Sequence, residues 1–333
     1  AARPAGYRVG GRITPLADQT ARDRGEAQAR DGQRRMPRSP LGGPATWRVG
    51  GASAEWAGLF AADIGAAGWL IDSVSAQIDA ERYAAALLAA ARGLPGLTVT
   101  TGWSVEALRG TGADWRLDSA SGTLLARQVI IAAGWHAGRI AGLIGAADDP
   151  ARYRVGAGIP AVGSAARADR PVKGQAARLS LDPALRPATA PETMPAVQAP
   201  GVFIVHHGGG AVAVGATSEA GETDCATDAG LDGVIARAVA LMPALVAARV
   251  ERRWAGIRPR PPGTLPRIGQ VADAPGLWHA SGGFKIGLAL AHHAGLAVAA
   301  AALGIEPGAA IGPFGPAPRL PAAFAPGPVR APA

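Results

Sequence analysis

The stretch Gln128-Val129-Ile130-Ile131-Ala132-Ala133-Gly134 constrains the fold of this chain more than any other segment. After Gln128 it is apolar without alternation and it ends in a glycine, which is typical of a strand buried on both faces of a parallel sheet. Parallel sheets occur in α/β proteins, in which short turns connect strands to helices. We therefore expect a parallel sheet at this position, with a turn at Gly134.

Two motifs near the C-terminus predict a site for anions. The motif Trp254-Ala255-Gly256-Ile257-Arg258-Pro259 sets an Arg between glycine and proline, and a fixed guanidinium can form two hydrogen bonds to one carboxylate. Residues 280–291 form a glycine turn that leads into an apolar helix, whose free N–H groups suit electron-rich oxygens. The pair favours a carboxylate substrate beside a large anionic cofactor. The alternative for Arg258 is a turn residue that pairs with a surface acid.

These two motifs resemble the C-terminal signature of the D-amino-acid-oxidase-like family of FAD-dependent amine oxidoreductases. Three more segments resemble family elements: Pro171-Val172-Lys173-Gly174-Gln175, Val212-Ala213-Val214-Gly215-Ala216-Thr217, and the strand that ends at Gly134. The resemblance extends from Gly10 to Leu320. It implies an α/β, Rossmann-like FAD-binding domain interleaved with an α+β substrate domain, which is built on a mixed, largely antiparallel sheet.

The resemblance also implies domain boundaries. It assigns residues 1–20, 75–150 and 268–305 to the FAD-binding domain, and residues 21–74 and 151–267 to the substrate domain, with a Pro-rich tail at 306–333. No GxGxxG motif follows a strand and opens a helix in this chain. We therefore expect that the chain lacks its first roughly 35 residues, about one βαβ unit.

Roles for individual residues follow from the resemblance. Arg258 is expected to bind the substrate carboxylate, and Lys285 to stabilise the negative charge that develops on the flavin. His206 and His207 are adjacent on a strand, so only one can face the site, and we select His207. The expected cofactor contacts are Gly10, Gly11, Arg12, Ile13, Val105, Ala133, Gly134, Trp135, Gly256, Gly282, Gly283, Phe284, Lys285 and Ile286.

The same resemblance implies the chemistry. A hydride would pass from the carbon beside the nitrogen of a small amine or amino acid (glycine, sarcosine or a D-amino acid) to the flavin, which oxygen or another electron acceptor reoxidises. The sarcosine oxidase branch attaches its flavin to a Cys in the Gly-Phe region, whereas the only Cys here is Cys225, so we expect non-covalent FAD. Gly263-Thr264 stand where relatives often have Asp-Gly, which leaves loop geometry and substrate preference open.

Composition limits the other function classes. The formal charge of +8 comes from scattered arginines and only 5% of residues are aromatic, a pattern that argues against nucleic acid as a partner. The six His and one Cys show no metal-ligand spacing, and we expect no metal. No apolar stretch is long enough to span a bilayer, no secretory signal is visible, and the lone Cys fits a reducing cytoplasm. The sequence does not determine the oligomeric state.

Two alternatives remain. The first is a domain like the FAD-dependent oxidoreductase that acts on the carboxymethylaminomethyl group of wobble uridine in tRNA, which the pI of about 10.8 favours. The second is a non-catalytic remnant that lacks the FAD diphosphate loop.

Local patterns predict the remaining elements. We expect helices within 22–44, from Asp79 to about Arg92, and from Asp228 to about Met242. A hairpin is expected from 202–207 and 211–217, joined by three glycines. Further strands are expected at 47–49, 68–71, 97–101, 115–117, 124–131 and 171–179.

Overall fold

The structure is a computed structural model, and it describes residues 6–40, 42–52, 56, 58–111, 114–142, 169–181, 194–261, 266–271 and 274–305. The predicted tail at 306–333 and the loop residues Gly263 and Thr264 lie outside these ranges. The chain divides into two compact units, with Ala1–Val99, Gly174–Ser218 and Asp224–Gly256 in the first and Thr100–Lys173, Glu219–Thr223 and Ile257–Ala333 in the second. This division differs from the predicted domains, whose boundaries stay a prediction.

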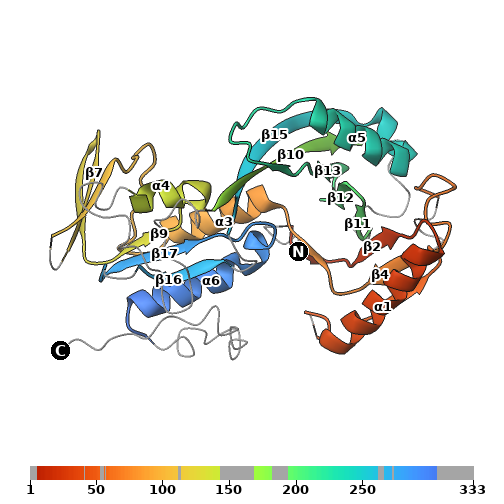
Figure 1. Ribbon diagram of the computed structural model, residues 1–333, viewed down its shortest axis with the longest axis horizontal. Helices are drawn as coiled ribbons and strands as arrows, with labels where there is room; N and C mark the ends of the chain where they lie inside the picture. The colour runs from red at the N-terminus through yellow and green to blue at the C-terminus, as the bar shows by residue number, and fades with distance from the viewer. Residues whose placement is uncertain are drawn as a thin grey trace. The chain divides into compact units, whose positions relative to one another are not determined.

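The largest sheet has nine strands in the order β14-β10-β13-β12-β11-β2-β4-β3, with β15 paired to β10 (Figure 1). From β14 to β3, neighbouring strands are antiparallel except for β2 with β11, which are parallel. The predicted hairpin is confirmed as β12 and β13, and its turn contains Gly208, Gly209 and Gly210, all at positive φ. The strands are β2 (Arg12–Pro15), β3 (Trp47–Gly50), β4 (Trp69–Asp72), β10 (Arg170–Ser180), β11 (Ala196–Ala199), β12 (Val202–His206), β13 (Ala211–Gly215), β14 (Glu219–Ala220) and β15 (Arg249–Arg260).

One face of this sheet forms the main core. Along β12, Val202 and Ile204 are buried while Phe203 between them is exposed, as the period of two requires. Helix α5 (Ala229–Leu241) covers the buried face, and its own apolar stripe includes Leu231 and Val234. The helix begins at its N-cap Asp228, whose carboxylate accepts a hydrogen bond from the Gly230 N–H, so the predicted helix is confirmed.

The N-terminal helix α1 (Gln19–Arg35) lies against β3 and β4 at the other end of the sheet. It starts earlier than the charge pattern predicted, because Asp18 is the N-cap and accepts the N–H of Ala21. Helix α3 (Ala80–Arg92) has the predicted start at Asp79 and ends at Gly93. The predicted strand at 97–101 is wrong: no strand is assigned there, since its β-forming side chains have no partner strand among the described residues.

The second unit contains two three-stranded sheets. Strands β9 (Val129–Ile131), β17 (Leu277–Ser281) and β16 (Arg267–Gln270) form one, in which β9 and β17 are parallel. The parallel strand that the apolar run predicted is therefore confirmed, whereas its expected burial on both faces is wrong: Ile131 is buried, but Ile130 is 40% exposed among the described residues. Helix α6 (Gly287–Ala302) packs on β16 and β17 through Val298 and Trp278, and the Trp278 indole N–H donates to the Gln128 side-chain oxygen at 2.7 Å.

The other three-stranded sheet has the order β6-β7-β8. The predicted strand at 124–131 is divided, since β8 ends at Ala126 and β9 starts at Val129. The remaining elements are β1 (Arg8–Val9), β5 (Ala76–Gln77), β6 (Ala107–Gly110), β7 (Trp115–Ser119), β8 (Gly122–Ala126), α4 (Ala137–Gly142), and the 3₁₀ turns η1 (Gly134–His136) and η5 (Pro243–Ala247).

Three further features concern function. Across the described ranges, no helix is long and apolar enough to cross a membrane. Within the same ranges, no group of three or more His, Cys, Asp or Glu side chains could hold a metal ion. Cys225 is a free, exposed thiol.

The backbone at Gly11 provides a test of this fold. Gly11 has φ +76, and a Cβ added there would lie 2.2 Å from the carbonyl oxygen of Asp72. We expect Gly11→Ala to lower the free energy of unfolding by about 2–4 kcal/mol, because strain in the backbone adds to a clash with main-chain atoms. Urea denaturation measures this loss.

The matched control is Gly51→Ala, where an added Cβ meets no atom within 4 Å. It should change the unfolding free energy by less than about 0.5 kcal/mol. Equal stability of the two variants would contradict the placement of Gly11 against Asp72.

Candidate functional site

The carboxyl ends of β9 and β17 bring two predicted glycine turns together. The strands are parallel, with Ile131 opposite His279, so both chains leave the sheet at the same edge. The Ser281 hydroxyl donates a hydrogen bond to the carbonyl oxygen of Gly134 at 3.0 Å, which joins the two turns directly. Ligands of open α/β sheets bind at this kind of edge.

The turn after β17 has an unusual backbone. Gly282 has φ +81, and Phe284 has φ +43, a left-handed conformation that L-residues with side chains rarely adopt. Gly283 is required by space, because a Cβ there would lie 2.4 Å from the Cα of Gly287. Helix α6 then begins with Ile286 as N-cap and without a side-chain cap, so the first N–H groups of the helix can bind an anion.

Arg258 lies in the second half of β15 and is half-buried. Burial lowers the pKa of Arg258, while the negative charge of Glu219 acts in the opposite direction. Glu219 also faces the buried Lys173, with 3.8 Å between Nζ and Oε2. Glu219 therefore acts on two cations, Arg258 and Lys173. The guanidinium of Arg258 stays protonated beside it.

The two C-terminal motifs meet through Arg260. The Arg260 guanidinium lies 5.6 Å from the ring centre of Phe284, and the Lys285 ammonium lies 5.6 Å from the same ring. Arg260 follows Arg258 by two residues on β15, and Gly256 precedes Arg258 by two on that strand. Thus the strand with the predicted carboxylate anchor contacts the predicted flavin turn.

Other predicted cofactor contacts lie near the same turns. Val105 and Ala133 are partly buried and pack on the core of the second unit. Trp135 is half-buried in the 3₁₀ turn that starts at Gly134.

The segment Gly10–Ile13 belongs to the nine-stranded sheet instead. Ile13 is fully buried in the main core, so its side chain has no surface for a ligand. The Arg12 guanidinium contacts the Asp72 carboxylate at 3.2 Å and donates to the Gln198 side-chain oxygen at 2.8 Å. Sheet pairing and the close approach of Gly11 to Asp72 thus explain these residues without a cofactor, and their predicted cofactor role stays a prediction.

His206 and His207 have opposite environments, as expected for neighbours at a strand end. Burial lowers the pKa of His207, Asp79 raises it, and the nearby arginines lower it further. His206 is only 4% exposed, and neither ring nitrogen has a hydrogen-bond partner among the described residues. Burial, with the charge of Arg8, lowers the pKa of His206 to about 4.

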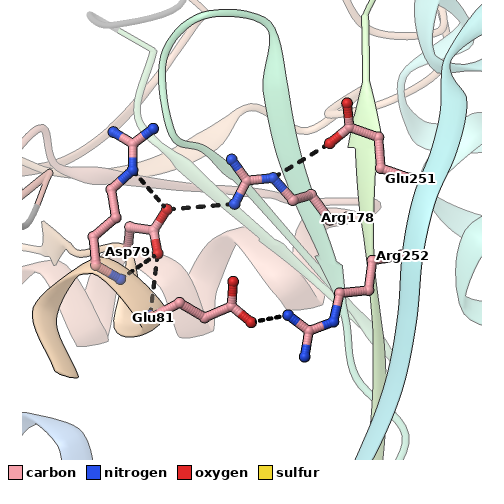
Figure 2. Close-up of polar contacts among 6 residues, drawn as sticks. Asp79, Glu81, Arg178, Glu251 and Arg252 are labelled. Atoms are coloured by element: carbon pink, nitrogen blue, oxygen red, sulfur yellow. Dashed lines mark hydrogen bonds and ion pairs between the residues drawn. The ribbon is translucent and has the colours of Figure 1, made fainter. Parts of the chain in front are cut away.

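Asp79 is the centre of a charged cluster, shown in Figure 2. Its carboxylate accepts the backbone N–H groups of Glu81 and Arg82 at 3.1 Å and lies 3.4 Å from Arg178. Arg178 also contacts Glu251 on β15 at 3.5 Å, and Arg252 pairs with Glu81. Burial raises the pKa of Asp79, but the Arg82 N–H and the charges of His207, Arg178 and Arg82 outweigh it and lower the pKa overall.

The sequence interpretation missed Lys173, Glu219 and Arg260. Lys173 belongs to the family element at residues 171–175, but the sequence did not predict that its side chain is buried. Side chains two apart on a strand lie on the same face, so the position of Arg258 could have identified Arg260 as a second residue of the site. Glu219 had no local signal, since its contacts come from distant strands.

This arrangement is that of an α/β flavoenzyme, and comparison with known proteins identifies the family. Residues 2–301 match the family described as "DAO: FAD dependent oxidoreductase", and the chain belongs to it. FAD is the cofactor of this family.

Known members of the family give further detail. A glycine oxidase of Geobacillus kaustophilus (strain HTA426) is 29% identical over 260 residues, which cover 78% of this chain and 62% of that protein. A glycine oxidase of Pseudomonas putida (strain KT2440) is 31% identical over 217 residues, covering 63% of this chain and 51% of that protein. The chain thus spans about half to two thirds of the length of these relatives.

The solved structure of glycine oxidase from Geobacillus kaustophilus superimposes with a TM-score of 0.72 at 26% identity, covering 91% of this chain and 73% of that one. The predicted fold class, an α/β and α+β fold with an FAD-binding domain and a mixed, largely antiparallel-sheet substrate domain, is confirmed.

The described residues fit FAD at the two glycine turns. A Cβ added to Gly134 or to Gly287 would meet no heavy atom within 4 Å, so a ligand can approach the backbone there. The uncapped start of α6 and the Lys285 ammonium suit the negative charge of a reduced flavin ring or of its phosphates. Gly134, Gly282, Lys285 and the first N–H groups of α6 would hold this part of the cofactor.

His206 makes stability depend on pH. Its pKa is about 4 in the folded protein and 6.5 in a model peptide, so the unfolded chain binds the additional proton first. We expect the free energy of unfolding to fall by about 3 kcal/mol as the pH decreases from 6.5 to 4. Urea denaturation at several pH values measures this.

His206→Asn should remove most of this pH dependence, whereas His207→Asn should keep most of it. A pH dependence that is unchanged in His206→Asn would show that other groups cause it.

Proposed function

We propose that this protein is an FAD-dependent oxidoreductase that oxidises the C–N bond of a small amine or amino acid of the glycine, sarcosine or D-amino-acid type. The observation that carries the proposal is the contact of β15 with the flavin turn: Arg258 and Arg260 project from one strand, and Arg260 lies 5.6 Å from the ring centre of Phe284. A carboxylate held by Arg258 would thus lie close to the cofactor.

When bound, FAD supplies the hydride acceptor. The protein's own residues bind and orient the substrate. Arg258 would hold the carboxylate in two parallel hydrogen bonds, and Glu219, which Lys173 contacts at 3.8 Å, would attract the guanidinium. Lys285 would stabilise negative charge that develops beside it, and this effect requires no proton transfer. The proposed chemistry therefore depends on orientation of the substrate by Arg258 and on the positive charge of Lys285, and it does not require a general acid and a general base.

The relatives support the substrate class. Two of them are named glycine oxidase, and they match this chain at 29% and 31% identity. Because the chain spans only 62% and 51% of their lengths, the substrate and the electron acceptor, oxygen or another, are part of the proposal.

The cofactor is proposed to be bound without a covalent bond. The one Cys of the chain is Cys225, which is exposed and lies far in sequence from the Gly282–Ile286 turn. The same lone thiol fits a reducing compartment, so we propose the cytoplasm as the location.

Arg258 tests the proposal. We expect Arg258→Met in the FAD-loaded protein to raise the KM for glycine about 100- to 1000-fold, because a partly desolvated charge pair loses its cation. Arg258→Lys should restore only part of the loss, since an ammonium keeps the charge but not the planar geometry. Steady-state kinetics on glycine and methylamine, a matched pair that differs in the carboxylate, measure the effect.

Methylamine should be affected far less than glycine. An equal loss for both would mean that Arg258 supports the fold or the cofactor. Retention of FAD through gel filtration is measured first for each variant, because it separates loss of cofactor from loss of substrate binding.

Lys285 tests the role of charge at the flavin turn. We expect Lys285→Met to lower kcat and kcat/KM together by about 10- to 100-fold, since a charge that acts on the transition state affects both. Lys285→Arg should retain most of the activity. Stopped-flow measurement of flavin reduction checks this, and a rise in KM alone would place Lys285 among the substrate contacts.

A further inference from the structure

The arginines of β15 differ in their partners. In the first half of the strand, Arg252 pairs with Glu81 and Arg253 contacts Asp232 at 2.6 Å. In the second half, Arg258 lies in the field of Glu219. Across the part of the chain that the structure describes, Arg260 forms no ion pair with a carboxylate, and its assigned contact is the ring of Phe284.

A second cation lies beside the same ring. The Lys285 ammonium is 5.6 Å from the Phe284 ring centre, as is the Arg260 guanidinium. Within the described ranges, Lys285 also has no carboxylate partner. Each cation gains from the electron-rich face of the ring, but like charges close together repel each other. An anion that binds within reach of both cations would reduce this repulsion.

The ring that both cations contact belongs to a residue with an unusual backbone. Phe284 adopts φ +43 in a turn that also contains Gly282 at φ +81. Because this turn leads directly into α6, the backbone of Phe284 has a defined position relative to the start of the helix. The ring that Arg260 and Lys285 contact is thus carried by an ordered turn, as expected for a recognition site.

Arg260 is also placed correctly relative to Arg258. Residues two apart on a strand point to the same face, with their Cα atoms about 6–7 Å apart. A substrate whose first carboxylate binds Arg258 could therefore place a second anionic group, a few bonds away, at Arg260. A neutral substrate side chain would leave both Arg260 and Lys285 without an anion.

From this geometry we propose that Arg260 is a specificity-determining residue that binds a second carboxylate of the substrate, with Lys285 contributing charge. The preferred substrates are then amino dicarboxylates. This inference rests on the proposed function, since it assumes that Arg258 binds the first carboxylate.

Substrates that differ only in the distal charge test the inference. D-Glutamate and D-glutamine have the same shape, and the FAD-loaded protein should show a kcat/KM at least about 10-fold higher for D-glutamate. Arg260→Gln should lower the value for D-glutamate about 10- to 100-fold and change that for D-glutamine and glycine by less than about 3-fold. Arg260→Lys should retain part of the preference.

The matched control is Arg252→Gln, a substitution on the same strand at an arginine whose partner is Glu81. It should leave the preference for D-glutamate unchanged. An equal value of kcat/KM for the two substrates, or an equal loss for both in Arg260→Gln, would overturn the inference. Loss of FAD from Arg260→Gln would instead assign Arg260 to the cofactor, and would overturn it as well.

A binding measurement separates this inference from the proposed function. Isothermal titration calorimetry with glutarate and with its monoamide, glutaramate, requires no turnover. We expect glutarate to bind more tightly, and Arg260→Gln to abolish the difference. Tighter glutarate binding without oxidation of any amine would contradict the proposed function but not the dicarboxylate site, and equal binding of the two probes would contradict the site.

Discussion

The carboxylate of Asp79 joins segments of the first unit that are far apart in sequence. It caps α3, contacts Arg178 on β10, and through Arg178 connects to Glu251 on β15 (Figure 2). The charges alternate along this path, so each group offsets the burial of the next. Because the pKa of Asp79 is lowered, its carboxylate keeps its charge to a lower pH than an ordinary Asp, and the ion pair with Arg178 persists with it.

The register of β15 has consequences for the site. Its first residues are exposed, and two of them form ion pairs with Glu81 and Asp232, whereas residues 255–259 are half-buried and Arg260 at the end is exposed. Individual surface ion pairs contribute little to stability, but several along one strand favour a single register over its shifted alternatives. A shift by one residue would turn Arg258 and Arg260 to the opposite face, and Arg260 would then lose its contact with the Phe284 ring.

Features with local causes were predictable from the sequence, and features with distant causes were not. The start of α3 at Asp79 and the strand β9 each follow from adjacent residues, and the structure has both, although Ile130 in β9 is exposed. Gly11 was interpreted as a cofactor contact, although the carbonyl of Asp72, 61 residues later, is sufficient to require a glycine there. Residues 97–101 have strand-forming side chains, but a strand also needs a partner, which local sequence does not reveal.

The left-handed backbone of Phe284 has a consequence for protein engineering. An L-residue at φ +43 carries strain of about 1–2 kcal/mol that a glycine would release. Phe284→Gly would release this strain, but it would also free the unfolded chain and remove the ring that contacts Arg260 and Lys285. Backbone strain and the contacts of two cations thus change together at this one position, so a library that varies residue 284 must be screened for both stability and activity.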